Sequence, residues 1–510
     1  HLKQQPNVLI VGPGGGYDVL AARLFGARAI TAVEINPIIA EDVMSSEPFK
    51  SYSGGIYHHP EVRLVVDEGR SFIRRSSDRY DILQATMVDT WAATAAGAFS
   101  LTENNLYTVE AFKDYATHLT DDGIFTMTRW YFEPPDQLLR LLTLTRAMMT
   151  ELGIGNAPRH VMLVRDARYR DERTPATFLF KKSEFTDDEV RAIEAHAARN
   201  GFELLYTPLT RPDNVFTRMI EAQNPEEVWK SFETNVDPTW DNNPFFFNSI
   251  RLSNLSRALS GAGEWQKTNL GTFVLFALFA ITTVMVVLFI IGPLVLVRGR
   301  ELKAGSGALS YLLYFGCLGA GFIIVEVAMI QKFILFLGHP VYALAVVLFS
   351  LLTFSAIGSY LSGRFAEAGL PKTIIKILVA VVALVFVYIA VLPPIFYGLV
   401  HLAHPLRILI AIVLMGPLAT VMGMPMPTGI RLLARNRPEI IPWAWGVNGA
   451  TSVMGSVAAL VIAILTGFNQ ALVVGSALYL AAVFFITRPQ ASDEQAGSRL
   501  RVREPVGAKG

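Results

Sequence analysis

The sequence has almost no cysteine and little charge, and each shortage excludes a class of protein. Its single cysteine, Cys317, lies inside an apolar run, so disulfides within the chain and zinc sites built from cysteines are both excluded. Charged residues make up 17% of the chain, the formal net charge is +1, and no run of Lys and Arg is interleaved with aromatic residues. We therefore expect no nucleic-acid partner, because binding to phosphate backbones needs a concentrated positive surface.

Hydrophobic residues make up 52% of the chain, and their distribution divides it into two parts. Residues 1–265 carry mixed charge, whereas the following part contains seven apolar stretches with few charges. These stretches lie near 270–297, 308–330, 341–362, 373–395, 406–428, 443–466 and 469–487. Each is long enough to cross a hydrocarbon core of about 30 Å as a helix. We predict a soluble domain over 1–265, an all-α polytopic transmembrane bundle over 266–488, and a polar, disordered tail over 489–510.

Strand and helix signals alternate along the soluble part at the spacing of βαβ units. The predicted strands are Val8–Gly12, Ala29–Glu34, Val62–Val66, Asp81–Thr86, Gly123–Met127, His160–Val164 and Thr177–Lys181. Because the runs are apolar on both faces, they indicate a mostly parallel, seven-stranded sheet covered by helices on each side. This is an α/β Rossmann-like fold of the class I methyltransferase type, ending in a hairpin. Since the first strand begins so close to His1, we expect the domain to be N-terminally truncated.

A glycine-rich turn follows the first strand and opens a helix whose first turn contains Asp18, and we predict that Asp18 and the glycines of the turn bind the ligand. Its glycines are Gly12, Gly14, Gly15 and Gly16. Glycine suits such a turn because it adopts unusual dihedral angles and lets a ligand approach backbone N–H groups. Tyr17 occupies the last position of the dinucleotide-binding fingerprint, so the pattern is GxGxG rather than GxGxxG. The alternative is a tight turn with no ligand.

Acidic residues follow the second and third strands. Glu34 lies about 20 residues after the glycine turn, where a carboxylate can accept hydrogen bonds from both ribose hydroxyls of a nucleoside. Asp67 and Glu68 come at the end of the third strand, where a carboxylate can face the amino group of adenine, which favours an adenosylmethionine-type ligand over NAD. The alternative is that Asp67 and Glu68 only cap the helix that runs to Arg75.

Asp89 lies in the loop after the fourth strand. Substrates of open α/β sheets bind outside the carboxyl ends of the strands, so Asp89 is placed to hold a cationic or protic acceptor beside a sulfonium. Its alternative role is to cap backbone N–H groups of the loop. We predict no metal site.

Several segments carry a resemblance to a known family. They are VLIVGPGGG, AVEINP, VRLVVDEGRSFI, YDILQ, the Asp89 loop, LYTVEAF and DDGIF. In order and spacing, from residue 7 to about 130, they resemble the polyamine aminopropyltransferases, the spermidine synthase family. Two later segments, GFIIVEVAMIQKFILFLGHPVYAL and IPWAWGVNGATSVMGS, resemble the membrane-fused bacterial branch of that family. The resemblance implies transfer of an aminopropyl group from decarboxylated S-adenosylmethionine to a diamine such as putrescine.

The sequence departs from this family in two places. The strand-four loop of the soluble synthases carries two aspartates; the second matches Asp89, but the first, the expected general base, falls on Thr86. A threonine cannot take a proton from an ammonium group at neutral pH. The small N-terminal β-hairpin domain of the soluble members is also absent from the sequence.

These departures keep other functions open. One alternative is a methyltransferase that uses S-adenosylmethionine, and another is a catalytically altered adenosyl-ligand-binding domain coupled to a membrane transporter. An NAD-linked oxidoreductase is least favoured, because Tyr17 spoils the fingerprint and no catalytic His or Tyr–Lys pair is evident. The expected partners are the lipid bilayer and a small amine, and the sequence leaves open whether the chain forms a homo-oligomer.

Two arguments about membrane orientation conflict. The basic residues of the membrane part lie in loops that seven simple crossings place opposite the soluble domain. They are Arg298, Arg300, Lys303, Arg364, Lys372, Arg431, Arg435 and Arg437. The positive-inside tendency would make their side cytoplasmic, whereas adenosyl ligands are made in the cytoplasm. We expect a multi-pass inner-membrane protein with a cytoplasmic nucleotide domain, and a re-entrant or half helix near Pro393–Pro394.

Overall fold

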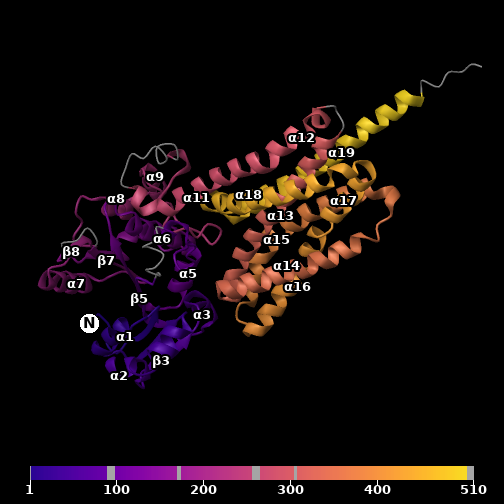
Figure 1. The fold of residues 1–510 in the computed structure, drawn as a ribbon. Coiled ribbons are helices and arrows are strands. Elements are labelled where there is room, and N and C mark those ends of the chain that lie inside the picture. Colours follow the sequence, from indigo (N-terminus) through magenta and orange to yellow (C-terminus); the bar gives the residue numbers. More distant parts are fainter. Residues whose placement is uncertain (1, 89–97, 169–173, 255–264, 304–306, 502–510) are drawn as a thin grey trace, which may run out of the picture. The chain divides into compact units, whose positions relative to one another are not determined.

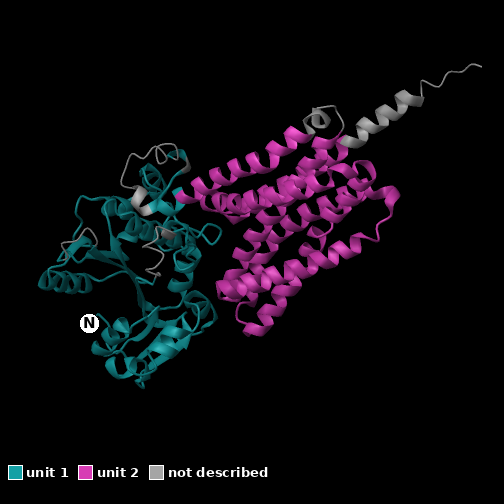
Figure 2. Ribbon diagram, in the orientation of Figure 1, with its two compact units in different colours: residues 1–273 teal, residues 274–510 magenta. Residues whose placement is uncertain are grey.

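The computed structural model describes residues 2–88, 98–168, 174–254, 265–303 and 307–501 (Figure 1). The chain divides into two compact units, residues 1–273 and 274–510 (Figure 2). The division falls inside a helix, α11 (Trp265–Val286), whose first turns belong to the first unit.

The first unit is built on one eight-stranded sheet with strand order β3-β2-β1-β4-β5-β7-β6-β8. The strands are β1 (Asn7–Val11), β2 (Ala29–Glu34), β3 (Val62–Val66), β4 (Tyr80–Thr86), β5 (Leu119–Tyr131), β6 (Val161–Arg165), β7 (Thr174–Lys181) and β8 (Glu203–Tyr206). The first five strands in this order, β3, β2, β1, β4 and β5, pair in parallel with their neighbours. The three strands beyond β5 pair antiparallel. The methyltransferase-type fold with its late hairpin is confirmed, but the expected count of seven is one too low. The missed strand, β8, is a four-residue edge strand that pairs with β6 across a register shift, so it is too short to show an alternating pattern.

Helices cover both faces of this sheet. They are α1 (Tyr17–Leu24), α2 (Phe49–Tyr52), α3 (Gly69–Arg75), α5 (Val109–Thr117), α6 (Asp136–Leu152), α7 (Asp187–Asn200), α8 (Val215–Glu221) and α9 (Pro225–Ser231), with the short turns η1 (Ile38–Val43), η2 (Ile56–His58) and η3 (Ala98–Leu101). One core packs α3, α5 and α6 against the sheet, and two smaller cores pack α1 and α7. Helix α7 begins at a capping box formed by Thr186 and Glu189 and ends at Gly201, whose φ is 67°.

The first turns of α11 are hydrogen-bonded to the rest of the first unit. The side chain of Asn269 accepts a hydrogen bond from the backbone N–H of Ser249 at 3.0 Å and donates one to the Ser249 hydroxyl at 2.8 Å. The backbone N–H of Thr272 donates to the hydroxyl of Ser100, in η3, at 3.1 Å. All four residues are buried.

The second unit contains the apolar helices. Among the described residues, seven spans are long and apolar enough to cross a membrane, as predicted. Their helices are α11, α12 (Gly292–Lys303), α13 (Ala308–Leu337), α14 (Pro340–Ser362), α15 (Leu370–Leu399), α16 (His404–Met422), α17 (Pro425–Asn436), α18 (Ile441–Thr466) and α19 (Phe468–Arg501). Helix α19 is described as far as Arg501, whereas residues 502–510 of the predicted tail lie outside the described residues, so a disordered tail stays a prediction.

The helix break expected near Pro393–Pro394 is in the wrong place. Both prolines lie within the continuous helix α15. The chain breaks instead between α16 and α17, at Gly423 and Met424. Prolines are tolerated in apolar helices because neighbouring groups satisfy the freed carbonyls. Gly423 has a packing reason, since a Cβ atom there would collide with the backbone of Ser355 in α14.

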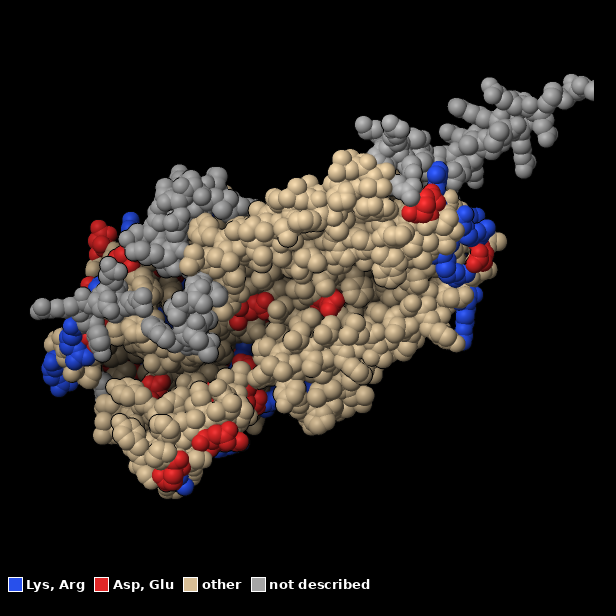
Figure 3. Space-filling model, viewed as in Figure 1, with Lys and Arg blue, Asp and Glu red and all other residues tan. Residues whose placement is uncertain are grey.

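Several charged side chains of the second unit lie together at one end, and much of the face drawn in Figure 3 carries none. The guanidinium of Arg431 pairs with Glu367 at 3.1 Å and donates to the carbonyl oxygen of Ser362 at 2.9 Å. Arg435 pairs with the same carboxylate at 3.4 Å. The basic residues of the 363–369 loop and of α17 therefore lie at the same end of this unit.

Candidate functional site

The sheet topology brings the predicted ligand-binding residues to one edge. Strands β3, β2, β1 and β4 are parallel neighbours, so their carboxyl ends lie side by side. Gly12 follows β1, Glu34 ends β2, Asp67 follows β3 and Thr86 ends β4. Asp89 lies outside the described residues, so its role as an acceptor-binding group stays a prediction.

The glycine turn has tightly packed ends, at Gly12 and Gly16, and an open middle, at Gly14 and Gly15. Its φ angles are in the left-handed region at Gly12 (66°), Gly14 (51°) and Gly16 (83°). A Cβ atom at Gly16 would lie 2.8 Å from the side chain of Ile56, and one at Gly12 would lie 3.0 Å from that of Val88. At Gly14 and Gly15, by contrast, no atom lies within 4 Å of such a Cβ. This middle part of the turn therefore leaves its backbone open to a ligand.

Glu34 is bound directly to that turn. Its carboxylate is 4% exposed and accepts hydrogen bonds from the backbone N–H groups of Gly14, at 3.1 Å, and Asn36, at 3.0 Å. Each carboxylate oxygen has a second lone pair, so Glu34 retains acceptor capacity for a ribose hydroxyl. The position and the chemistry are those that a nucleoside requires.

Tyr57, in η2, completes the turn, and the sequence pattern did not single it out. Its hydroxyl donates to the carbonyl oxygen of Gly14 at 2.6 Å. Burial raises the pKa of Tyr57, and the nearby carboxylates of Glu34 and Asp18 raise it further, so the hydroxyl stays protonated and remains a donor. The only local signal was the pair Gly54–Gly55, in which both residues have positive φ and which precedes η2.

Glu68 caps helix α3, and Asp67 is bound beside this cap. The two carboxylate oxygens of Glu68 accept hydrogen bonds from the backbone N–H groups of Arg70, at 3.0 Å, and Ser71, at 2.7 Å. Asp67 accepts from the backbone N–H of Glu68 at 2.8 Å and forms an ion pair with Arg75 at the far end of α3. The capping alternative is therefore what these contacts show, and recognition of adenine stays a prediction.

Replacing Glu68 with alanine should lower the free energy of unfolding by about 1 kcal/mol, because the N-cap of α3 is lost. The shift in the thermal midpoint of the full chain measures this effect. Glu41→Ala, at an exposed position in η1, is the control and should shift the midpoint much less. A destabilisation no larger than that of the control would contradict the capping role.

Asp18 faces β4 rather than the open part of the glycine turn. Its side chain is 8% exposed and lies within hydrogen-bonding reach of the side chains of Thr86 and Gln84. The amide of Gln84 also donates to the Thr86 hydroxyl at 3.2 Å. Burial raises the pKa of Asp18 and outweighs the opposing effect of the two hydrogen bonds. Asp18 and Thr86, which are far apart in the sequence, thus form one polar cluster.

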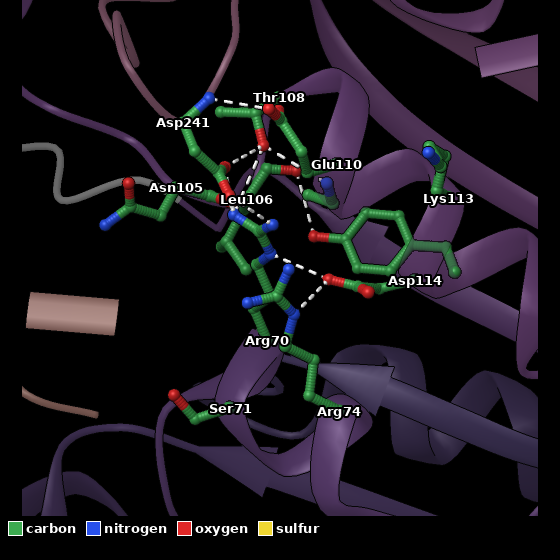
Figure 4. A network of polar contacts seen from close by, with 12 residues as sticks. Arg70, Ser71, Arg74, Asn105, Leu106, Thr108, Glu110, Lys113, Asp114 and Asp241 are labelled. Carbon is green, nitrogen blue, oxygen red and sulfur yellow. Dashed lines mark hydrogen bonds and ion pairs between the residues drawn. The ribbon is translucent and has the colours of Figure 1, made fainter. Parts of the chain in front are cut away.

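Arg70, a buried arginine that the sequence pattern also missed, connects α3, α5 and the segment that carries Asp241 (Figure 4). The guanidinium of Arg70, in α3, is fully buried and makes two hydrogen bonds to Asp241, at 2.5 and 2.9 Å. Its Nε atom donates to Asp114 in α5 at 2.9 Å. Burial alone would lower the pKa of Arg70, but the two carboxylates raise it above its ordinary value. The segment that carries Asp241 is therefore fastened to both helices.

Two side chains of α5 and its N-cap extend this network. The hydroxyl of Thr108 donates to Asp241 at 2.7 Å, and the carboxylate of Glu110 accepts from the backbone N–H of Asp241 at 3.0 Å. Burial and the neighbouring Asp241 raise the pKa of Glu110 to about 7. The network holds the loop-to-helix junction that follows β4.

The described residues contain no group of three or more His, Cys, Asp or Glu side chains arranged to hold a metal ion.

Comparison with known proteins points to one family. No protein-family model matches the chain. The polyamine aminopropyltransferase of Pectobacterium carotovorum subsp. carotovorum (strain PC1) is 31% identical over 120 residues, which are 23% of this chain and 38% of that protein. The enzyme of the same name from Buchnera aphidicola subsp. Acyrthosiphon pisum (strain Tuc7) is 27% identical over 127 residues, 25% of this chain and 41% of that protein. The chain thus spans about two fifths of the length of these curated relatives.

Solved structures of spermidine synthases are also among the similar proteins. The enzyme from Thermotoga maritima has 19% identity and a TM-score of 0.28, and the match covers 45% of this chain and 69% of that one. A probable spermidine synthase from Corynebacterium glutamicum has 19% identity and a TM-score of 0.31, with 42% and 70% covered. Over the segment matched to the curated relatives, this chain is a homologue of the polyamine aminopropyltransferases, and it also carries seven long apolar helices.

Proposed function

We propose that this protein is a membrane-bound aminopropyltransferase that uses decarboxylated S-adenosylmethionine as donor and a diamine such as putrescine as acceptor. The observation that carries the proposal is the open backbone of Gly14 and Gly15 directly beside the buried carboxylate of Glu34. This pairing suits the ribose of an adenosine, and the curated relatives supply the reaction type.

The proposed roles follow the edge of the sheet. The turn from Gly12 to Gly16 and Glu34 bind the adenosine, and Asp67 faces the adenine. Asp89 holds the acceptor amine beside the sulfonium. The sulfonium is already a good leaving group, so the protein mainly has to align the amine in line with the bond that breaks.

A second candidate function is an adenosyl-ligand-binding domain that has lost transfer activity and is coupled to transport. Thr86 favours it, because a threonine stands where a proton acceptor is expected. The break between α16 and α17 also favours it, since interrupted helices line substrate paths in transporters. A methyltransferase that uses S-adenosylmethionine would share the same donor site.

We further propose that the adenosine-binding unit faces the cytoplasm at the inner membrane. The adenosyl donor is made there, and an enzyme without its donor has no activity. The basic end of the second unit argues for the opposite orientation, but the positive-inside rule is a bias of short loops with known exceptions. We therefore give more weight to the cytoplasmic source of the donor and propose a cytoplasmic adenosine-binding unit.

Calorimetry and product analysis on the purified full chain in detergent test this function. We expect saturable binding of decarboxylated S-adenosylmethionine and none of NAD, and formation of methylthioadenosine and spermidine when putrescine is added. Binding without product would favour the transport-coupled function, and methylated product from S-adenosylmethionine would favour a methyltransferase. Absence of saturable binding of any adenosyl sulfonium would refute the donor site.

Replacing Glu34 with glutamine should weaken donor binding about 10- to 100-fold, because hydrogen bonds to a charged acceptor contribute about 1.5 to 3 kcal/mol. Titration calorimetry with the donor measures this loss. Glu47→Gln, at an exposed carboxylate between η1 and α2, is the matched control and should leave the affinity unchanged. Equal donor affinity in the Glu34 variant and the wild type would contradict the ribose-binding role.

A further inference from the structure

Transfer of an alkyl group to a diamine at neutral pH requires a proton acceptor. A primary alkylammonium group loses its proton only near pH 10, and its nitrogen has no free electron pair until it does. A carboxylate or another weak base next to the acceptor must therefore take that proton. The described residues at the carboxyl ends of β1 to β4 offer four carboxylates for this task.

Three of these four carboxylates are already committed to backbone or cationic partners. Glu34 binds two backbone N–H groups of the turn region, and Glu68 binds two at the start of α3. Asp67 forms its ion pair with Arg75. These partners already occupy lone pairs that a proton from the amine would need.

Asp18 differs from them in its surroundings. The polar side chains within hydrogen-bonding reach of it are those of Thr86 and Gln84, which are neutral, and it is buried. Among the described residues, Tyr57 lies near it from η2, Glu34 acts on the same tyrosine from the end of β2, and the facing side chains of β4 are neutral. Burial raises the pKa of Asp18, which makes its carboxylate a stronger base than an exposed aspartate.

Thr86 is the last residue of β4, at the carboxyl end of the strand, where the acceptor of an open α/β sheet is expected to bind. It is only half-buried, whereas Asp18 is buried. The next residue, Met87, has a φ of 45°, a left-handed conformation that is strained for a non-glycine residue and that clusters at functional sites. The Gln84 amide donates to the Thr86 oxygen, which leaves the threonine proton free to point at Asp18.

We propose that Asp18 is the proton acceptor for the amine and acts through the hydroxyl of Thr86, an inference that rests on the proposed aminopropyl transfer. The ammonium group gives its proton to the Thr86 oxygen while the threonine proton moves to the Asp18 carboxylate. The neutral amine then attacks the propyl carbon bound to sulfur, the C–S bond breaks, and its electron pair stays on sulfur. The products are a neutral thioether and a secondary ammonium ion, and Asp18 is left protonated until it releases its proton to solvent.

This relay accounts for a threonine at the end of β4. The hydroxyl does not have to hold a proton, since it passes one on, and the base lies one side chain further back. The arrangement needs both residues: without Asp18 the proton has no destination, and without the Thr86 hydroxyl the buried carboxylate is out of reach of the amine.

Asp18→Asn and Thr86→Val test the relay in the full chain, with donor binding, product formation and pH dependence as readouts. We expect each variant to form product about 10²- to 10³-fold more slowly, the usual contribution of a general base, with donor affinity within about threefold of the wild type. Thr86→Ser should keep most of the activity, and the double variant Asp18→Asn with Thr86→Asp should regain it, because a carboxylate then faces the amine directly. Asp42→Asn, at an exposed position in η1, is the matched control.

The pH profile separates a proton acceptor from a merely structural residue. The wild-type rate should level off above the pKa of Asp18, whereas the Asp18→Asn rate should rise about tenfold per pH unit toward pH 10, because only amine that is already neutral reacts. Glu103 is the alternative proton acceptor to be tested, because burial raises its pKa to about 8. If Glu103→Gln removes the plateau and Asp18→Asn does not, the inference is overturned.

The remaining outcomes are distinct. Product from the wild type together with unchanged product formation by Asp18→Asn overturns this inference and leaves the proposed function standing. A loss of donor affinity that accounts for the whole loss of rate in Asp18→Asn also overturns it and assigns Asp18 to the donor site. No product from a wild type that binds the donor overturns the proposed function, and this inference with it.

Discussion

Replacing Arg70 with methionine should lower the free energy of unfolding of residues 1–273 by about 3 to 5 kcal/mol, because removing one partner of a buried ion pair leaves its counter-charges uncompensated. Asp241 and Asp114 would both lose their contacts with the guanidinium. At about 2 to 4 °C per kcal/mol for a domain of this size, the thermal midpoint should fall by roughly 10 °C. Thermal unfolding of the full chain in detergent measures the shift.

Two further variants make this prediction specific. Arg63→Met removes an exposed arginine from β3 and should change the free energy of unfolding by less than about 0.5 kcal/mol. Combining Arg70→Met with Asp241→Leu should recover part of the loss, because replacing a buried pair with apolar groups removes the stranded charge. An Arg70 variant as stable as the Arg63 variant would show that the network does not hold the unit together.

A valine in place of Gly358 should separate α14 from α16 and lower the stability of the second unit by about 1 to 3 kcal/mol. A Cβ atom at Gly358 would collide with the carbonyl oxygen of Thr420, and one at Gly423 would collide with Ser355. Small residues at such crossings let two helix backbones approach closely in an apolar solvent. The hydroxyl of Ser355 uses this proximity to donate to the carbonyl oxygen of Ala419 at 3.1 Å.

Gly398→Val is the matched control for this contact. Gly398 lies in α15, is exposed and would have no atom within 4 Å of its Cβ. Both variants change the same side chain in an apolar helix, so their difference reports the crossing alone. Thermal unfolding in a mild detergent and the retained monodisperse fraction measure it, and equal values for the two variants would refute a close crossing.

Local chemistry made much of the first unit readable from the sequence. The strands β1 to β4 could be predicted because each is a short apolar run that ends in glycine or in a polar residue. The start and end of α7 could be predicted because a capping box and a terminal glycine act within a few residues of each other. The glycine turn and Glu34 could be predicted because their spacing is fixed by one βαβ unit.

The parts that could not be predicted depend on pairing over long distances. Arg70 and Asp241 are 171 positions apart, and each looks like one charge among many in a sequence of mixed charge. Asp18 was placed with the donor site because it follows the glycines, but its hydrogen bonds go to a strand that is far along the chain. No periodicity reports such pairs, because strand order, and not spacing, brings them together.

The hydrogen bonds at the start of α11 set where the first unit can be separated from the membrane part. Asn269 and Thr272 come after the predicted boundary at 265, yet they fasten Ser249 and Ser100. A fragment that ends at residue 265 would lose the hydrogen-bonding partners of these two serines, whereas a fragment that ends at residue 273 keeps them.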